Sequence, residues 1–482
     1  MDFLSIKFLL FLFGSILIVY RSPIPYRISI VFPLLNVLFI FTFINHLTAL
    51  IPLACFLLAG FLSIRLVVAF PYKSTFIAVT GFVLLIFIYL KKYAFLSFVH
   101  FIDWPYLSVG LSYILFRMIQ ILVDVHQQAI QEKVTLASFF NFCCNFLTFV
   151  SGPIQRYQDH KIQEAALGQK ALTETEVFHC FSRMIHGLLK VVILATVCNN
   201  YHQWFVEGGL QGSAIEGSVL FLCRKFILAS LFYALYLYFN FSGYMDIVIS
   251  FGKLLGFQLP ENFNQPFESR SFLDFWTRWH ITLADWFKFY VFNPFLQLLA
   301  MKWPSRSVVP YLGVIAYFFT FLLMGIWHGS SMTFLIYGLF LGAGVSINKL
   351  FDVLMRKYFS KPYNKFIDHG LSGLLGSAFT WMYFSMALSS FWLDYSDLIG
   401  LITKLKIKGF VLSFLLGGII CAVVIGLFRL VRKLLLGFPP YWLSMAGNFY
   451  ISRAWVTFQL LLVIAFGFYG FGDIPDFVYK AF

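Results

Sequence analysis

Long apolar runs separated by short polar connections extend along almost the whole chain. A helix that crosses a membrane needs about 20 apolar residues, and the runs have this length. They are continuous, whereas the strands of a transmembrane barrel alternate apolar and polar residues over about ten positions. The pattern therefore predicts an all-α, polytopic helical membrane protein with roughly eleven transmembrane helices. The predicted spans are 3–20, 28–45, 48–70, 74–90, 177–198, 217–239, 308–326, 332–348, 371–393, 409–430 and 455–472.

Four segments between these spans mix aromatic residues with polar residues and glycine, so that they are neither clean spans nor clean loops. Irregular backbone at membrane depth is tolerated only where protein or a water-filled cavity covers it. We therefore expect re-entrant and interfacial helices around a central funnel that contains a site. The four segments are 96–135, 138–157, 236–270 and 271–297.

The first apolar run, MDFLSIKFLLFLFGSILIVYR, carries one early lysine and no small-residue cleavage site. A secretory signal peptide would normally end in such a cleavage site. We expect a retained first span rather than a removed signal peptide.

A histidine lies inside a stretch that carries no charged residue between Arg306 and Lys349. At about 1.5 Å per residue this stretch is too long for one span, so the chain must cross the bilayer twice, with a break near Gly325 or Gly329. His328 falls at that break, in the sequence FLLMGIWHGSSMT. Either it decorates a tight surface hairpin, or it is held inside the protein at membrane depth, where an ionisable residue usually has a function.

The segment SRSFLDFWTRWHITLADWFKFYVFNPF, residues 269–295, combines tryptophans with cations. Ser271 and Asp274 have the spacing of a capping box, which predicts a helix that starts at Ser271. Tryptophans and cations together are typical of a helix that lies in the membrane interface. The helix is either a peripheral anchor only, or it also presents His280 to the interior. Large side chains recur along it at spacings of three and four, namely Trp276, Trp279, Leu283, Trp286 and Tyr290.

Composition narrows the class of protein further. The chain has 482 residues, of which 60% are hydrophobic and 12% charged, and its mean hydropathy is +0.82. The net charge of +14 fits cytoplasmic loops that face anionic lipid, so we expect a lipid membrane and no nucleic acid as partner. None of the seven cysteines belongs to a CxxC pair, and we expect neither a disulfide framework nor a metal site.

The motifs that the chain lacks limit its chemistry. It contains no GxSxG elbow, no HExxH and no P-loop, so a nucleophilic serine has no support. Histidine is the side chain best suited to act as a general base near neutral pH. Base-assisted attack by an external nucleophile is therefore the simplest chemistry for a histidine site.

Five sequence blocks, taken in order, resemble the membrane-bound O-acyltransferase family, and specifically its bacterial branch that acts in alginate acetylation and teichoic acid D-alanylation. The resemblance covers about residues 100–350 in detail. The blocks are GLSYILFRMIQILVDVHQ (110–127), FLTFVSGPIQRYQD (146–159), HGLLKVVILA (186–195), YFNFSGYMDIVISFGKLLGFQLPENFNQPFESRSFLDFWTRWHITLADWFKFYVFNP (238–294) and GIWHGSSMTFLIYGLFLGA (325–343).

The resemblance implies that His328 is the catalytic histidine and that His280, within the RWH triplet, is a second functional one. Two positions depart from the family pattern, because Asn240 stands where the family usually has an acid and Met245 stands where it usually has a small residue. Further residues of the same blocks are expected to bind substrate, namely Arg278, Trp279, Trp327, Asp246, Asn240 and Asn262.

The resemblance also implies a single membrane O-acyltransferase domain over 1–482. Within it we expect N-terminal helices over 1–95, a catalytic core over 96–350 and C-terminal helices over 351–482. The longest polar stretch, 155–176, is too short to hold a polysaccharide, so we expect a separate extracytoplasmic acyltransferase as partner.

The expected activity is transfer of an acyl group, with acetyl favoured, from a cytoplasmic thioester to a hydroxyl of an exported cell-surface polysaccharide. The donor would be acyl-CoA or an acylated phosphopantetheine on an acyl carrier protein, with no permanently bound cofactor. The location would be the cell inner, cytoplasmic membrane. Transfer of D-alanyl or a longer acyl group is the alternative within the family, and a non-catalytic permease or a structural anchor is the alternative outside it. The acceptor polymer stays open.

Overall fold

The computed structural model is helical through most of the residues that it describes, which are 6–44, 46–100, 110–169, 172–207, 210, 217–436 and 449–469. Ten helical segments in this part of the chain are long and apolar enough to cross a membrane. An isolated antiparallel bridge between Phe263 and Trp279 is the β-type pairing found there. The prediction of an all-α, polytopic membrane protein is confirmed.

Ten of the predicted spans coincide with these ten segments. The remaining prediction, 3–20, coincides with α1 (Ile6–Arg21), whose 16 described residues are shorter than a typical span of about 20 residues. The apolar runs therefore locate the long helices well.

The described residues divide into two compact units, each assembled from separate stretches of chain. Within the described residues, the first unit comprises 6–184 and 244–261, and the second comprises 185–243 and 262–469. The predicted single domain over 1–482, with segments 1–95, 96–350 and 351–482, is defined by activity rather than by compactness, and it stays a prediction.

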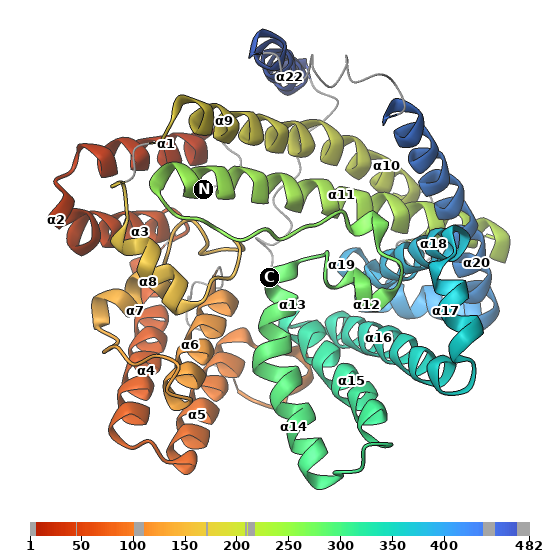
Figure 1. The fold of residues 1–482 in the computed structure, drawn as a ribbon, viewed down its shortest axis with the longest axis horizontal. Coiled ribbons are helices and arrows are strands. Elements are labelled where there is room, and N and C mark those ends of the chain that lie inside the picture. The colour runs from red at the N-terminus through yellow and green to blue at the C-terminus, as the bar shows by residue number, and fades with distance from the viewer. Residues whose placement is uncertain are drawn as a thin grey trace. The chain divides into compact units, whose positions relative to one another are not determined.

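The first unit places α4, α5 and α6 side by side (Figure 1). α6 carries Arg117, Gln120 and Asp124 on one face, and nearly all of its side chains are buried. The helices of this unit are α1, α2 (Ile24–Tyr26), α3 (Phe32–Phe41), α4 (Leu50–Ala69), α5 (Lys73–Lys91), α6 (Leu111–His126), α7 (Leu136–Cys143), α8 (Tyr157–Ala165) and the first part of α9 (Glu174–Leu189).

A buried arginine joins two of the sequence blocks inside the first unit. Arg117 of α6 is 2% exposed, and its guanidinium donates to the carbonyl oxygens of Phe142 at 2.9 Å, Cys143 at 2.7 Å and Thr148 at 2.6 Å. It also donates to the Thr148 hydroxyl at 2.6 Å. A buried charge is tolerated only when it is well hydrogen-bonded, and these bonds hold the irregular chain after α7 against α6.

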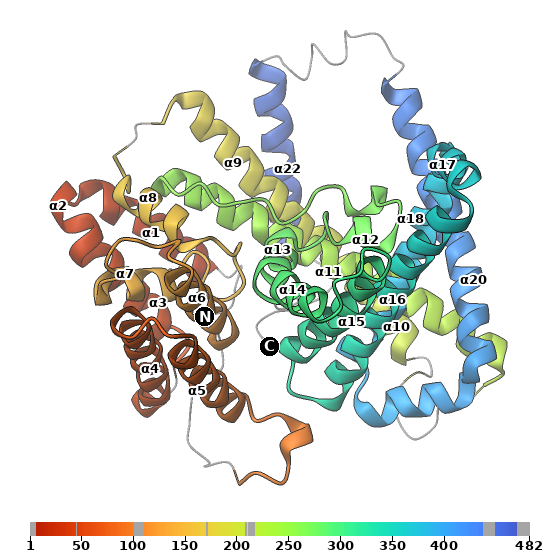
Figure 2. The same cartoon turned by 60° about the horizontal axis from the view of Figure 1, so that its bottom comes forward.

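The second unit contains the remaining helices. The main ones are α10 (Thr196–Glu207), α12 (Phe272–Phe275), α13 (Ile281–Phe287), α14 (Asn293–Lys302), α15 (Val309–His328), α16 (Met332–Tyr358), α17 (Ser360–Asp368), α18 (Gly370–Ala387), α19 (Ser389–Trp392), α20 (Tyr395–Leu436) and α22 (Phe449–Tyr469). Figure 2 shows α15 and α16 packed alongside each other, with α14 next to α15.

Two glycines allow α15 and α16 to approach closely. A Cβ on Gly325 of α15 would collide with the backbone of Gly338 on α16, and a Cβ on Gly338 would lie 2.6 Å from the carbonyl oxygen of Leu322. Small residues at such crossings let helix backbones meet inside membranes. The glycine that the sequence suggested as a break therefore lies within α15 and serves its packing.

One expected irregular segment is helical instead. α11 extends over Val219–Leu255, so the chain does not become irregular at 236, as predicted, but only after Leu255. Gly243 does not break this helix, because it serves packing: a Cβ there would lie 2.6 Å from the carbonyl oxygen of Gly187 on α9. A glycine required for close helix approach looks the same in a sequence as one that ends a helix.

Candidate active site

His328 is the last residue of α15 and is buried in the second unit, with 4% of its surface exposed. Its ring contacts the rings of Trp327, Tyr337 and Phe391, with centroids 4.9, 5.6 and 5.6 Å away. Of the two alternatives from the sequence, the buried position inside the protein is correct and the exposed hairpin is wrong.

The chain turns directly after His328 for a steric reason. Gly329 adopts an extended conformation, and a Cβ there would collide with the ring of Phe334. α16 begins three residues later at Met332. The predicted break at Gly329 is therefore confirmed, and it brings α16 back along α15 with Tyr337 next to His328.

His280 is 1% exposed and adopts the left-handed conformation, with φ 44° and ψ 51°. A non-glycine residue in this conformation costs on the order of 1 kcal/mol, so neighbouring contacts must hold it in place. Its ring meets Phe241 of α11 edge-on at 4.8 Å. Its carbonyl oxygen accepts hydrogen bonds from the amides of Leu283 and Ala284, both at 3.0 Å, and so starts α13.

The preceding segment holds His280 in this conformation. The side-chain oxygen of Asn262 accepts from the amide of Thr282 at 3.0 Å and from its hydroxyl at 2.7 Å. The carbonyl oxygen of Asn262 accepts from the amide of Ile281 at 3.0 Å. The amide of Asn264 donates to the carbonyl of Arg278 at 2.9 Å. Residues 262–264 thus pair with 278–282 on both sides of His280.

This pairing corrects the prediction of one helix from Ser271. Ser271 does cap a helix, because its hydroxyl accepts from the amide of Asp274 at 3.1 Å. The Asp274 carboxylate, however, accepts from the amide of Arg270 at 2.9 Å rather than closing the box onto Ser271. α12 ends at Phe275. The backbone near His280 forms hydrogen bonds with Asn262 and Asn264 and therefore cannot continue the helix.

His328 lies close enough to His280 for its charge to act on the His280 ring. Burial, followed by the positive charge that His328 would carry, lowers the pKa of His280 well below its usual range. His280 is therefore neutral at physiological pH. The structure places in one unit the two histidines that the sequence indicated as functional residues.

The two predicted tryptophans are both buried in the second unit. Trp279 is 2% exposed and packs against Phe263, Trp381 and Phe384, with ring centroids 5.1, 6.0 and 4.8 Å away. Trp327 packs on His328. Four of the five members of the predicted stripe are buried, so they face protein and not only lipid, namely Trp276, Trp279, Leu283 and Trp286. The fifth, Tyr290, is half-buried.

The remaining predicted substrate residues have different surroundings. Arg278 is partly exposed and pairs with Asp274 at 3.0 Å. Asn240 is fully buried on α11 in the second unit. Asp246 belongs to the first unit, where its carboxylate pairs with Arg183 at 2.9 Å, and Arg183 also pairs with Glu261 at 2.6 Å. Substrate binding by any of these residues stays a prediction.

The sequence interpretation missed Tyr337 and Phe391, which form the wall next to His328. Tyr337 lies on the helix that returns after the turn at Gly329. The prediction of two spans with a turn at His328 therefore indicates only that some residue of the returning helix lies near His328. Phe391 comes from α19, far along the chain, and no local pattern indicates its position. In the described residues, no group of three or more His, Cys, Asp and Glu side chains is arranged to hold a metal ion.

Fold and site together define the class of protein, a multi-pass membrane protein with a buried pair of histidines in one helical unit. A model of the membrane-bound O-acyltransferase family matches residues 44–396. The chain therefore belongs to the membrane-bound O-acyltransferase family, a family of acyltransferases.

Several curated proteins are similar to this chain. The teichoic acid D-alanyltransferase of Bacillus subtilis is 31% identical over 282 residues, which cover 54% of this chain and 67% of the relative. A probable alginate O-acetylase of Pseudomonas syringae is 30% identical, covering 52% of this chain and 45% of the relative. The peptidoglycan O-acetyltransferase of Helicobacter pylori is 28% identical, covering 53% and 50%. The chain thus spans only about half the length of the latter two relatives.

Proposed function

We propose that the protein transfers an acyl group, with acetyl favoured, from a cytoplasmic thioester to a hydroxyl acceptor, for modification of an exported cell-surface polysaccharide. The observation that carries the proposal is the buried pair of imidazoles, His328 at the end of α15 and His280 at the start of α13. Family membership supports acyl transfer. Relatives named for O-acetylation of alginate and peptidoglycan support acetyl.

In this mechanism, His328 accepts the proton of the acceptor hydroxyl while the hydroxyl oxygen attacks the thioester carbonyl. The new C–O bond forms, the C–S bond breaks, and the leaving thiolate takes the proton back from the imidazolium. General base catalysis contributes typically about 10²–10⁴-fold. Because His280 is neutral, one ring nitrogen can donate a hydrogen bond to the carbonyl oxygen as negative charge develops on it.

The proposed donor is acyl-CoA or an acylated phosphopantetheine on an acyl carrier protein. Both donors carry a phosphate on the pantetheine arm. Arg278 would leave its ion pair with Asp274 and bind this phosphate instead. Both side chains of that ion pair are partly exposed. The donor is consumed as a substrate, so the proposal includes no permanently bound cofactor.

The test is thioester consumption by the purified full chain in lipid vesicles, supplied with labelled acetyl-CoA or labelled acetyl carrier protein and a soluble oligosaccharide. We expect acetyl transfer by the wild type and a fall of about 10²-fold or more for His328→Ala. The matched control is His179→Ala, which removes an exposed histidine of α9. Turnover near the wild-type rate in His328→Ala would contradict the role of His328 as base.

The relative named teichoic acid D-alanyltransferase supports an alternative acyl group. Labelled D-alanyl carrier protein in the same vesicles distinguishes the two, since the preferred donor gives the higher kcat/KM. A permease is the alternative from another class. It would move the labelled acceptor across the vesicle membrane without consuming a thioester.

We also propose an inner, cytoplasmic membrane location and a separate extracytoplasmic acyltransferase as partner. The donor thioester is cytoplasmic, whereas the polymer is modified after export. The described residues consist of helices and short connections, and the longest polar stretch, 155–176, is too short to bind a long polymer. A second protein outside the cytoplasm would transfer the acyl group to the exported polymer, which lies on the other side of the membrane from the donor.

A further inference from the structure

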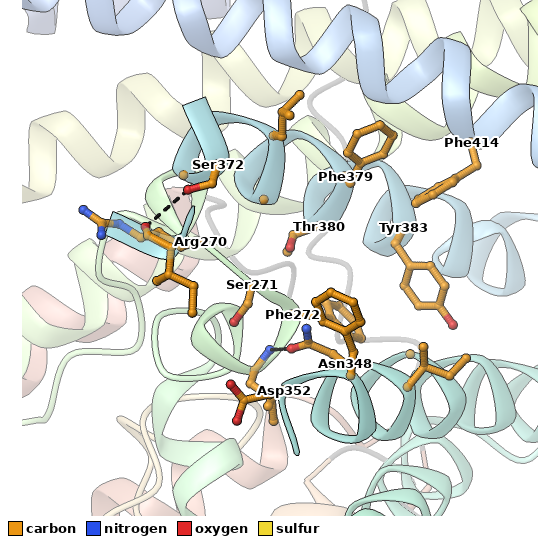
Figure 3. Close-up of a pocket in the computed structure, with 18 of the residues that line it drawn as sticks. Arg270, Ser271, Phe272, Asn348, Asp352, Ser372, Phe379, Thr380, Tyr383 and Phe414 are labelled. Carbon is orange, nitrogen blue, oxygen red and sulfur yellow. Dashed lines mark hydrogen bonds between the residues drawn. The ribbon is translucent and has the colours of Figure 1, made fainter. Parts of the chain in front are cut away.

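The second unit contains a large cavity that is separate from the histidine pair. Its volume is about 1020 Å³, and its walls are the residues before and within α12, the second half of α16, and parts of α17, α18 and α20 (Figure 3). Neither His328 nor His280 lines it. A cavity of this size holds a ligand larger than a few waters.

The interior of the cavity is apolar. Phenylalanines from five helices line it, namely Phe272, Phe340, Phe351, Phe366, Phe379, Phe410 and Phe414. The polar side chains in the wall are mostly bonded to the protein itself. Asn348 accepts from the amide of Leu273 at 3.1 Å, and the Tyr383 hydroxyl donates to the carbonyl oxygen of Phe340 at 2.6 Å. The wall therefore suits a hydrocarbon chain better than a polar molecule.

One end of the cavity has the character of a membrane interface. The short helix α17 turns Tyr363, Phe366 and Ile367 to the cavity, while Lys361 and Lys365 are exposed. A short helix with one apolar face and lysines on the other is typical of the lipid headgroup region. α17 therefore marks the headgroup end.

Arg270 lies at the same end and is exposed. Its side chain lies over Gly373, where an added Cβ would come within 3.8 Å of it, and its guanidinium forms no ion pair with another described residue. In Figure 3, Arg270 and Ser372 lie at one end of the cavity, and Tyr383 and Phe414 lie at the other. The same end also carries Asp352, whose carboxylate pairs with Arg356 at 2.8 Å, so Arg270 is the cation there without a paired carboxylate among the described residues. The cavity thus runs from this charged end to an aromatic end.

The cavity is longer than one lipid leaflet is deep, so it is long enough to hold an acyl chain. From Arg356 to Phe340, both in its wall, α16 rises about 24 Å at 1.5 Å per residue. One leaflet contributes about 15 Å to a hydrocarbon core of about 30 Å. α16, α18 and α20 each overlap a segment that is long and apolar enough to cross a membrane, so the cavity lies among candidate membrane-spanning helices.

We propose that this cavity binds one acyl chain of an anionic glycerophospholipid from the bilayer, with the lipid phosphate on Arg270. The chain would occupy the space among α16, α18 and α20, and the phosphate would contact the guanidinium at the headgroup end. Binding is non-covalent, and the lipid is a bound component rather than the acyl donor. The proposal does not depend on the activity proposed above.

The test uses the full chain in phosphatidylcholine vesicles that contain phosphatidylglycerol with a photoreactive group at the end of one acyl chain. We expect labelling of peptides from the aromatic end of the cavity, which contain Phe379, Phe410 and Phe414. Thr380→Phe adds a ring inside the cavity and should abolish this labelling, whereas the matched variant Thr380→Ser should keep it. Unchanged labelling in Thr380→Phe, or labelling outside the cavity wall only, would overturn the proposal.

A second measurement tests the charge. Arg270→Gln should reduce labelling by the phosphatidylglycerol probe about fivefold, as expected for about 1 kcal/mol from one arginine near a charged surface. The control is Arg306→Gln, which removes an exposed arginine away from the cavity. Equal labelling by phosphatidylglycerol and phosphatidylcholine probes in the wild type would overturn the anionic assignment. Displacement of the probe by palmitoyl-CoA, but not by unlabelled phosphatidylglycerol, would assign the cavity to the donor instead. Thermal unfolding of each variant excludes loss of the fold as the cause.

Discussion

Asn262 holds the backbone on the C-terminal side of His280 with three acceptor contacts, two through its side-chain oxygen and one through its carbonyl. Asn262→Ala would leave the buried amide and hydroxyl of Thr282 without this oxygen. An unsatisfied buried donor costs about 1–3 kcal/mol. Since His280 adopts a strained conformation, we expect it to relax and acyl transfer to fall by about tenfold or more per 1.4 kcal/mol of lost positioning.

The matched control for this prediction is Asn264→Ala. Asn264 lies in the same segment and is exposed, and its hydrogen bonds with Arg278 use only the backbone atoms of Asn264. We expect its variant to keep nearly full activity. Labelled acetyl transfer and thermal unfolding, measured on both variants, separate loss of positioning from loss of fold. Equal activity in the two variants would argue against a positioning role for Asn262.

His160 of α8 predicts a dependence of stability on pH. It is 1% exposed, among the rings of Phe32, Phe142 and Phe257 in the first unit, and neither ring nitrogen has a hydrogen-bond partner in the part of the chain that the structure describes. Burial, and then the charges of Arg117 and Lys161, lower the pKa of His160 to about 3.

The unfolded chain binds a proton at this histidine below about pH 6.5, whereas the folded protein does so only near pH 3. Above pH 6.5 this histidine is neutral in both states and does not lower the free energy of unfolding. Below pH 6.5 the free energy of unfolding falls by about 1.4 kcal/mol per pH unit. We expect His160→Phe to be more stable relative to the wild type at pH 4.5 than at pH 7.5. Thermal unfolding in detergent at both pH values measures this, and a constant difference between the two proteins would disagree with it.

At the scale of the element, a close contact between two helices lies three residues before His328. Gly325 meets the backbone of Gly338 where α15 crosses α16. Gly325→Val would force the helices apart at a cost of about 1–3 kcal/mol, as for other overpacked sites, and would displace His328 and Tyr337 relative to each other.

We expect Gly325→Val to lower the unfolding temperature and to reduce acyl transfer more than stability alone explains. Gly313→Val is the matched control, because Gly313 lies on the same helix with no atom within 4 Å of an added Cβ. Both variants are compared by thermal unfolding and by labelled acetyl transfer. Similar behaviour of the two would show that the crossing does not control the site.

Element boundaries could be predicted where hydrophobicity decided them and not where packing did. The turn after His328 follows from an uncharged run too long for one span. The continuation of α11 through Gly243 and the interruption of the helix near His280 depend on Gly187, Asn262 and Asn264, which contact these sites from other segments. The position of residues 272–290 near the membrane surface stays a prediction, although this region contains none of the candidate spans among the described residues.

For the whole molecule, we predict that this protein does not complete polymer modification alone. In vesicles loaded with donor on the cytoplasmic side and polymer on the other, it should consume the thioester but leave the polymer unmodified. Addition of an extracytoplasmic acyltransferase from the same organism should then give modified polymer. Full modification by the single protein would refute the need for a partner.

The sequence by itself determined the helical membrane architecture, because lipid requires long apolar helices whose own backbone groups are satisfied. It also singled out His328 and His280, because histidine is rare in apolar surroundings and because the sequence blocks around both resemble a family. Only the tertiary structure decided that both imidazoles are buried in one unit, that Asn262 fixes the chain beside His280, and that Tyr337 and Phe391 cover His328. These contacts join residues far apart along the chain, and hydrophobic periodicity carries information about neighbours along a helix but not about which helices meet.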